Sequence, residues 1–151
     1  MKNKIEITIG TTADIETIAQ FQINMAMESE GYKLNQEQIV RGVSAVMSDA
    51  NKGTYLVARV DGIAVGSLLL TREWSDWNNC WYWWVQSVYV MPQYREQGIY
   101  RTMYSHVKGM TQSENVSQVR LYVDKSNYSA QRVYQKLGMQ ECHYLMYEEV
   151  I

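Results

Sequence analysis

The chain has 151 residues, 46% of them hydrophobic, which is enough for one packed domain and too few to divide comfortably into two. Its formal net charge of −2 excludes the broad basic field that would hold a nucleic-acid backbone. Two cysteines, two histidines and no apolar run near the roughly 20 residues of a membrane span argue against a metal, a disulfide framework or a membrane anchor. We therefore expect a single cytoplasmic domain over residues 1–151 that binds no nucleic acid, membrane or metal.

The small net charge hides an uneven distribution. Residues 92–136 carry seven Lys and Arg against three Asp and Glu, a balance of +4, and the rest of the chain therefore carries −6. A positive segment suits an anionic ligand and a negative remainder suits a cationic one. The alternative is a chance imbalance between solvated faces.

The first third of the chain predicts a strand and two helices. Residues 5–10 alternate isoleucine with polar residues, which is typical of a half-buried strand. Apolar residues then recur at helical spacing after the possible caps Thr11 and Thr12, and this pattern fades at residues 28–31. A second helix is expected over residues 35–48, with Asn35 as its cap.

The centre of the chain predicts three strands. Residues 54–60 and 63–70 are apolar and are joined by Asp61-Gly62, the dipeptide that a tight type I′ hairpin prefers. A third strand is expected over residues 81–91, because the only proline follows it and cannot donate to a strand ladder.

The last third predicts a helix, a strand, a helix and a strand. The periodicity changes to that of a helix over residues 98–110, and a strand is expected over residues 119–123. Asn127 can cap a further helix that Gly138 ends, and residues 144–148 predict a final strand. The order β-α-α-β-β-β-α-β-α-β indicates a mixed α/β fold, similar to α+β proteins.

One candidate binding segment covers residues 88–101. A strand stops, the chain turns, and Gly98 opens a helix whose first N–H groups have no partners within the helix. Such a helix start attracts anions, the glycine leaves room for a diphosphate, and Arg95 and Arg101 add positive charge. The plain alternative is a tight turn.

The second candidate segment covers residues 124–139 and contains Tyr134. The helical spacing makes Tyr134 a core residue, and a buried hydroxyl would need a partner. A tyrosine beside a cofactor could instead give a proton to a departing sulfur, since phenol is protonated at neutral pH, with a reference pKa of about 10.

Together these segments resemble the GNAT superfamily of acyl-CoA N-acyltransferases. Arg95, Gly98 and Tyr100 correspond to the pyrophosphate loop Q/R-x-x-G-x-G/A. The later family signature, N-x-x-A-x-x-x-Y-x-x-x-G-F, corresponds to Asn127, Ala130, Tyr134, Gly138 and Met139. The sequence departs from the family at Tyr100, whose ring we expect to turn outward, and at Met139, a tolerable exchange in a core.

The resemblance implies a single-domain GNAT fold, in which helices flank a mostly antiparallel sheet with a splayed pair of parallel strands and acetyl-CoA lies between those two strands. It implies that one strand holds the pantetheine arm, that amides of the loop hold the pyrophosphate, and that Tyr134 protonates the departing thiolate. The residues expected to bind acetyl-CoA are Val88, Tyr89, Val90, Arg95, Gln97, Gly98, Ile99, Tyr100, Arg101 and Asn127.

The acceptor side is expected where family members place it, at the end of the first helix, with Glu28 as general base and Glu30 as a binding residue. Trp74, Asp76 and Trp77 could also bind an ammonium group through aromatic faces and charge. The alternative is that the tryptophans are sheet core or a dimer surface.

The expected function is direct transfer of an acetyl group from acetyl-CoA to a primary amine of a small molecule or peptide, by a monomer or homodimer. A non-catalytic acetyl-CoA sensor is the alternative. A nucleotide-binding Rossmann domain is disfavoured because no G-x-G-x-x-G follows the first strand.

Overall fold

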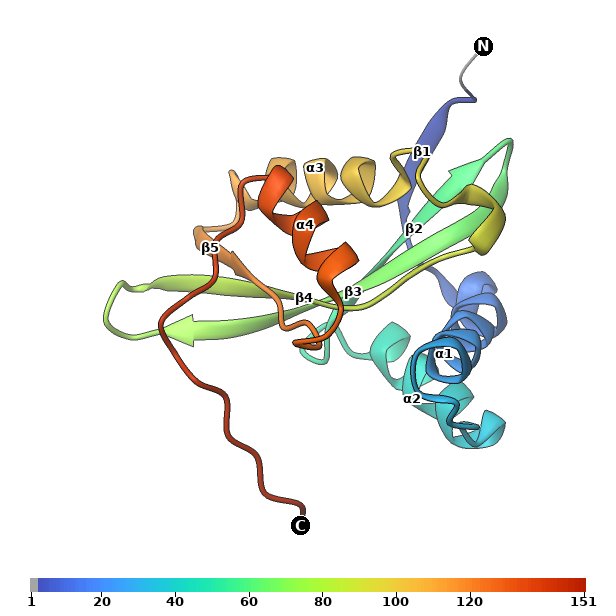
Figure 1. The fold of residues 1–151 in the computed structure, drawn as a ribbon, viewed down its shortest axis with the longest axis horizontal. Helices are drawn as coiled ribbons and strands as arrows, with labels where there is room; N and C mark the ends of the chain where they lie inside the picture. The colour runs from blue at the N-terminus through green and yellow to red at the C-terminus, as the bar shows by residue number, and fades with distance from the viewer. Residues whose placement is uncertain (1–2) are drawn as a thin grey trace. The chain divides into compact units, whose positions relative to one another are not determined.

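The computed structural model describes residues 3–151 and contains one mixed sheet. Its strands follow chain order across the sheet, with antiparallel pairs from β1 to β4 and a parallel pair between β4 and β5 (Figure 1). The strands are β1 (Ile5–Ile9), β2 (Thr54–Val60), β3 (Ile63–Ser75), β4 (Cys80–Val90) and β5 (Val116–Arg120). This confirms the expected α/β class and its mostly antiparallel sheet.

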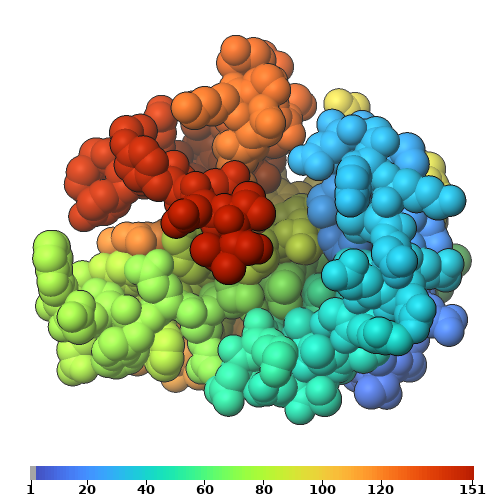
Figure 2. All heavy atoms as spheres, turned by 90° about the horizontal axis from the view of Figure 1, so that it is seen from below, coloured from blue at the N-terminus to red at the C-terminus, as the bar shows by residue number. Residues whose placement is uncertain are grey.

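Helices lie between the strands where the periodicity predicts them. The α-helices are α1 (Ile15–Glu30), α2 (Gln36–Ser48), α3 (Ile99–Thr111) and α4 (Tyr128–Lys136), and two short 3₁₀ turns are η1 (Thr12–Asp14) and η2 (Pro92–Tyr94). The Asn35 side chain accepts a hydrogen bond from the Gln38 amide at 2.9 Å, which confirms the predicted cap of α2. Helices α1 and α2 pack side by side (Figures 1 and 2).

The β2–β3 hairpin has the predicted tight turn. Asp61 and Gly62 adopt φ values of 51° and 79°, as a type I′ turn requires. Strand β3 extends beyond the expected residues 63–70 to Ser75, because it pairs with β4 as far as Cys80. The two strands form a long ribbon with the turn at residues 76–79.

The expected strand over residues 144–148 is wrong. This segment is extended chain without a strand partner, and its apolar side chains from Tyr144 to Tyr147 are at least 61% exposed. An apolar pattern predicts a strand only where a neighbouring strand can pair with it. Strand β5 also begins and ends earlier than expected, at Val116 and Arg120 in place of residues 119–123.

The chain divides into two compact units, one that ends at Leu121 and one that covers Tyr122–Ile151. The first unit holds the sheet with α1, α2 and α3, and the second holds α4 and the extended segment. Each is described by itself. Among residues 3–151 no helix has both the length and the apolar character needed to cross a membrane.

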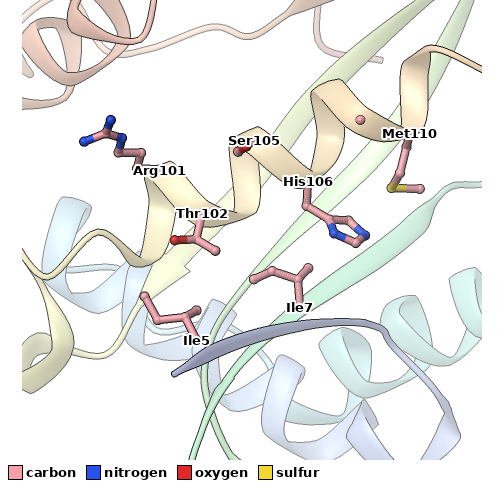
Figure 3. A pocket seen from close by; sticks show the side chains of 8 residues that line it. Ile5, Ile7, Arg101, Thr102, Ser105, His106 and Met110 are labelled. Atoms are coloured by element: carbon pink, nitrogen blue, oxygen red, sulfur yellow. The ribbon is translucent and has the colours of Figure 1, made fainter. Parts of the chain in front are cut away.

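An open groove runs between β1 and α3 on the first unit. Ile5 and Ile7 of β1 face the helix, where Thr102 and His106 border the same groove (Figure 3). Neither β4 nor the loop before α3 lines this groove, and Arg101 is the one residue of the candidate segment 88–101 that borders it.

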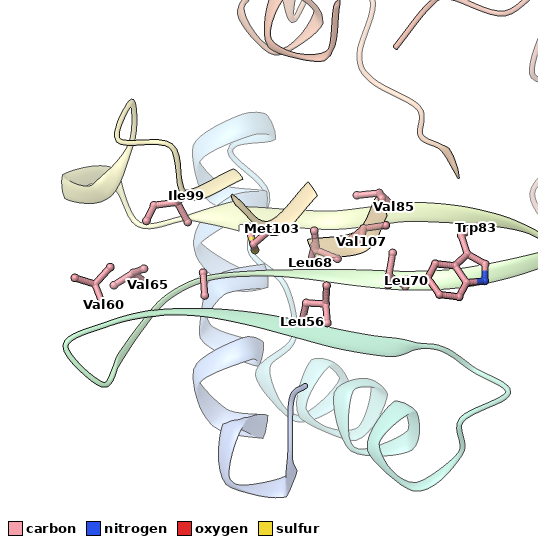
Figure 4. Close-up of a cluster of buried hydrophobic side chains, with 11 residues drawn as sticks. Leu56, Val60, Val65, Leu68, Leu70, Trp83, Val85, Ile99, Met103 and Val107 are labelled. Carbon is pink, nitrogen blue, oxygen red and sulfur yellow. The ribbon is translucent and has the colours of Figure 1, made fainter. Parts of the chain in front are cut away.

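Two hydrophobic clusters hold the sheet between its helices. On one face, Met103 and Val107 of α3 pack with strand residues such as Leu56, Leu68 and Val85 (Figure 4). On the other face, Ile18 of α1 and Val43 of α2 pack with residues of β2 and β3. Burial of each such side chain contributes about 1.5–3 kcal/mol, so these clusters fix the backbone of β4 and α3 on which the candidate site is built.

Candidate cofactor and acceptor site

Strand β4 contains a β-bulge near its end. Its pairing with β3 shifts between Ser67 and Leu69, so that Ser87 and Val88 lie opposite one residue of β3. Ser87 has a φ of 54°, a left-handed conformation that is uncommon for serine. The buried side chain of Gln22 lies against this point and donates to the Ser87 carbonyl at 3.5 Å. The bulge therefore bends β4 at the start of the predicted pantetheine segment.

The sequence analysis missed this bulge because no glycine marks it. One signal was present in α1. Gln22 occupies the apolar face of the helix, one turn after Ile18, and only 4% of it is exposed. A glutamine on a buried helical face indicates an exposed backbone group nearby that it must satisfy.

Beyond the bulge, β4 presents backbone groups along an edge that β5 does not cover. The Met91 amide donates to Val65 of β3 at 2.8 Å. The N–H and C=O groups of successive residues in a strand point toward opposite edges. Those of Val88 and Val90 therefore point away from β3. The parallel pairing with β5 stops at Trp84, so within the described residues no strand pairs with that edge of β4 from there on.

Helix α3 begins beside the end of this strand. Gly98 caps the helix with a φ of 84°, and a Cβ built on it would meet no atom within 4 Å. The amides of Ile99, Tyr100 and Arg101 form the first turn and have no acceptor within the helix. Gly98 is thus required by its left-handed backbone, and the space before the helix start is open for an anion.

Arg95, Glu28 and Tyr89 form a polar cluster next to this loop. The Glu28 carboxylate accepts from the Arg95 guanidinium at 2.6 Å and from the Tyr89 hydroxyl at 2.9 Å. Arg95 also donates from Nε to the Val90 carbonyl at 2.8 Å. The cluster therefore links the end of α1 with the end of β4. The Arg95 guanidinium is already engaged with Glu28 and Val90.

This cluster changes the acidity of two members. The hydrogen bond from Arg95, aided by the one from Tyr89, lowers the pKa of Glu28 below its ordinary value. Burial, together with the hydrogen bond to Glu28, raises the pKa of Tyr89. Glu28 is therefore a weaker base than an ordinary glutamate, and Tyr89 stays neutral at neutral pH.

The Tyr100 ring does not turn outward, which corrects the expectation from sequence. Tyr100 is half-buried, packs against the cluster on the α3 face and stacks with Tyr104 at 6.1 Å between ring centroids. The residue therefore fits this loop because the core accepts its ring, and its backbone amide stays in the first turn of α3. Gln97 is exposed, and its side chain donates to the Gln93 carbonyl at 2.9 Å, which closes the loop.

The second unit contains Asn127 and Tyr134. Asn127 Oδ1 accepts from the Ala130 amide at 3.1 Å, and the helix ends before Gly138 at a φ of 97°, so the predicted cap and stop of α4 are confirmed. Burial raises the pKa of the Tyr134 phenol. Tyr134 thus holds its proton at neutral pH, as a proton donor must.

The expected acceptor residues do not lie together. Trp74, Asp76 and Trp77 are at the turn of the β3–β4 ribbon, and Trp77 is 89% exposed. Glu28 contacts Tyr89 at the other end of β4. At about 3.3 Å per strand residue, Tyr89 is about 30 Å from the turn that carries the tryptophans. Glu30, at the end of α1, is exposed. The tryptophans of residues 81–84 include Trp83, which belongs to the hydrophobic cluster.

The described residues of the first unit fit a coenzyme A thioester. The start of α3 offers amides for a diphosphate, and the edge of β4 that no strand pairs with beyond Trp84 offers amide and carbonyl groups for an arm that itself contains amides. The arrangement is suited to holding an extended anionic ligand along β4, with its reactive end toward the bulge.

Comparisons with known proteins agree with this geometry. The model of the acetyltransferase (GNAT) family matches residues 19–139. A solved structure described as a possible acetyltransferase from Clostridium difficile 630 is 40% identical, with a TM-score of 0.91 over 97% of both chains. A comparison with curated protein sequences finds no match.

Two more distant structures share the fold. The ribosomal-protein-alanine N-acetyltransferase from Brucella melitensis biovar Abortus 2308 is 15% identical, with a TM-score of 0.81 over 98% of this chain and 99% of its own. The aminoglycoside N-acetyltransferase AAC(6')-Iy in complex with CoA is 14% identical, with a TM-score of 0.81 over 99% of this chain and 97% of its own.

Proposed function

Because the chain belongs to the acetyltransferase (GNAT) family, we propose that it transfers an acetyl group from acetyl-CoA to a primary amine of a small molecule or peptide. The observation that carries the proposal is the helix start at Gly98 beside the edge of β4 that no strand pairs with beyond Trp84. A structural neighbour that holds CoA on the same fold supports the choice of cofactor.

In this proposal the backbone does most of the binding. Amides from Gln97 to Arg101 hold the pyrophosphate. The backbone of Val88 and Val90 holds the pantetheine arm, with the Val90 carbonyl shared with or released by Arg95, which donates to it in this structure. Tyr89 anchors β4 to helix α1, because its buried ring packs on Phe21 at 5.2 Å between centroids. Acetyl-CoA supplies an activated acyl group and a thiol that can leave.

Proton transfer accompanies the reaction at two places. The amine must lose a proton before or during attack, since its reference pKa is about 10.4. With its pKa lowered by Arg95, Glu28 suits a positioning role better than that of the base, so we assign this deprotonation to water. Tyr134 is assigned the proton that the departing sulfur takes up.

The acceptor is proposed to bind near the end of α1. Glu30 places negative charge there, whereas the charge of Glu28 is already paired with Arg95, and the balance of the chain outside residues 92–136 is −6. A small amine cannot also reach the turn with Trp74, Asp76 and Trp77, about 30 Å away. Those residues would contribute only for a long peptide acceptor.

The proposal is tested by a screen of amines that detects CoA release from acetyl-CoA. Small polyamines, aminoglycosides and peptides with free amino groups form the panel, and Gly98→Asp is the control because its carboxylate would oppose the diphosphate. We expect turnover with at least one amine in the unmodified chain and none with the variant. Tight acetyl-CoA binding with no turnover across the panel would favour a non-catalytic sensor.

A further inference from the structure

Arg95 holds two acceptor groups that the proposed function requires for other partners. Its guanidinium donates from Nε to the Val90 carbonyl at 2.8 Å and from Nη2 to the Glu28 carboxylate at 2.6 Å. In the proposed function the backbone of Val90 binds the pantetheine arm, and the cationic amine binds near the end of α1, where Glu28 lies. As long as one guanidinium holds both groups, neither is available to its ligand.

The Arg95–Glu28 ion pair lies at the surface, where it can exchange partners. The two side chains are 44% and 40% exposed. Water and salt weaken an exposed pair of this kind, so it contributes little to stability. A diphosphate carries more negative charge than one carboxylate and offers several oxygens to a guanidinium, so it is the stronger partner for Arg95.

The two members of the pair stand differently toward an anion at the start of α3. Arg95 follows η2 and belongs to the same short loop as Gly98, which opens the helix. Its positive charge favours a diphosphate held by the loop amides. Glu28 comes from α1, and its carboxylate both opposes such an anion and competes with it for the guanidinium.

Tyr89 is suited to keep Glu28 in place when Arg95 leaves it. The Tyr89 hydroxyl donates to Glu28 Oε1 at 2.9 Å, and its buried ring packs on Phe21 of α1. Arg95 at present lowers the pKa of Glu28, and an ordinary glutamate, with a pKa of about 4.3, is still ionised at neutral pH. The released side chain is therefore a positioned carboxylate without its cation, which is a suitable partner for an ammonium group.

We propose that acetyl-CoA draws Arg95 away from Glu28 and Val90, so that binding of the cofactor completes the sites for both substrates. The inference rests on the proposed function and adds a coupling between the two substrates to it. The phosphates gain a guanidinium, the pantetheine arm gains the Val90 carbonyl, and the amine gains the Glu28 carboxylate. Because such coupling is reciprocal, an amine bound at Glu28 also favours acetyl-CoA.

The experiment compares the Kd of acetyl-CoA, measured by calorimetry on the full chain, between variants. Glu28→Gln releases Arg95 but keeps an oxygen for the Tyr89 hydroxyl, so acetyl-CoA should bind about two- to fivefold more tightly, the range that an exposed ion pair is worth. A purely structural role of the ion pair would instead make binding weaker. Glu30→Gln removes an exposed carboxylate from the same end of α1 and is the matched control for charge alone.

Arg95→Met supplies a second test, because it keeps an unbranched side chain of similar length and removes every donor. It should weaken acetyl-CoA binding several-fold. S-acetylpantetheine, which lacks the phosphates, should bind more tightly to the same variant in an NMR titration, because the Val90 carbonyl is released and no phosphate contact is lost. In the Arg95→Met background, Glu28→Gln should change the Kd of acetyl-CoA no more than Glu30→Gln does.

Three results would overturn the inference and leave the proposed function standing. One is acetyl-CoA binding that Glu28→Gln weakens or leaves unchanged. Another is S-acetylpantetheine binding that Arg95→Met fails to tighten. The third is a tightening by Glu28→Gln that persists in the Arg95→Met background, since charge alone would then be its cause. An unmodified chain that binds no acetyl-CoA would overturn the proposed function itself, and the inference with it.

Discussion

Glu28 illustrates how neighbours set the role of a single residue. Its carboxylate accepts two hydrogen bonds, from Arg95 at 2.6 Å and from Tyr89 at 2.9 Å, and its pKa is lowered as a result. A carboxylate of low pKa is ionised at neutral pH but takes protons poorly. Its contacts instead hold Arg95 against the end of β4 and orient the Tyr89 hydroxyl.

We predict that Glu28→Gln lowers kcat less than about tenfold and keeps the acidic limb of the pH–rate profile, because no proton passes through this side chain. Glu30→Gln is the matched control two residues along the same helix, and steady-state kinetics with the amine found in the screen is the measurement. A loss of about a hundredfold or more, together with disappearance of the acidic limb, would show that Glu28 is the base after all.

Tyr134 poses the opposite case, a group that holds its proton firmly. Burial raises its pKa above the phenol reference. Transfer to a free thiolate of pKa about 8.5 would be uphill by at least about 2 kcal/mol, so the proton must move as the bond to sulfur breaks. We predict that Tyr134→Phe keeps acetyl-CoA binding and lowers the single-turnover rate by about a hundredfold.

Tyr134→Ala separates chemistry from packing in the same assay. It should lose stability as well as rate, because it leaves a cavity. Normal single-turnover rates in a folded Tyr134→Phe protein would leave Tyr134 with a packing role alone.

At the scale of elements, β3 approaches β4 so closely at Gly66 that this position has no room for a side chain. A Cβ on Gly66 would lie 2.7 Å from the Tyr89 carbonyl oxygen, which belongs to the backbone and cannot move aside cheaply. We predict that Gly66→Ala lowers the free energy of unfolding by about 1–3 kcal/mol and weakens acetyl-CoA binding, because β4 must shift. Denaturant unfolding and calorimetry measure the two effects.

Gly42→Ala is the control for this substitution. Gly42 lies within α2, is exposed, and has no atom within 4 Å of a built Cβ. Alanine there should raise the free energy of unfolding by about 0.5–1 kcal/mol. If both variants lose the same stability, the contact with Tyr89 is not the cause.

A partly buried ion pair between Asp14 and Arg59 links the turn after β1 with strand β2. Asp14, 6% exposed, accepts from Arg59 at 2.6 Å and from the Thr11 amide at 3.0 Å. Burial acts to raise the pKa of Asp14, but these hydrogen bonds outweigh it and the net shift is downward. The unfolded chain therefore binds the proton more readily, so the pair stabilises the fold above about pH 4 and loses its contribution as pH falls through the lower, folded pKa.

Asp14→Asn should cost about 2–3 kcal/mol at neutral pH, because Arg59 is left partly buried without its partner. The difference from the unmodified chain should shrink as the pH falls below 4. Urea unfolding at a series of pH values measures this, and a pH-independent difference would assign the effect to packing.

Periodicity and turn chemistry predict most elements here, because local rules govern them. The caps of α2 and α4 and the turn at Asp61-Gly62 depend on residues within four positions. The bulge at Ser87 escapes such rules, since it depends on how β3 and β4 register over their whole length. The extent of β3 and the absence of a strand at residues 144–148 are likewise decided by partners in space.

The candidate site divides in the same way. The sequence order of Gly98, Asn127 and Tyr134 suffices to identify the family, because the family motifs are local. The neighbours of Glu28 and the separation of Trp77 from α1 are set by the length and course of β4, which no motif records.

At the scale of the whole molecule, charge is unevenly distributed along a nearly neutral chain. Residues 92–136 carry +4 and the remainder −6. Part of the positive charge is already neutralised, because Arg95 pairs with Glu28. Arg101, in the first turn of α3, is exposed, and the structure records no ion pair for it among the described residues.

This distribution leads to a prediction about salt. Acetyl-CoA carries a diphosphate and a further phosphate, so its attraction to the positive segment should be screened as the Debye length falls from about 10 Å at 0.1 M salt to about 3 Å at 1 M. We predict that the Kd for acetyl-CoA, measured by calorimetry, rises several-fold over this range. S-acetylpantetheine, which has the arm and thioester but no phosphates, should bind more weakly and show almost no dependence on salt. Arg101→Gln should reduce the salt dependence of acetyl-CoA binding while leaving that of S-acetylpantetheine unchanged. Equal salt dependence for the two ligands would mean that the phosphates are not held by this segment. The proposed position of the diphosphate at the start of α3 would then be wrong even if the transfer reaction is correct.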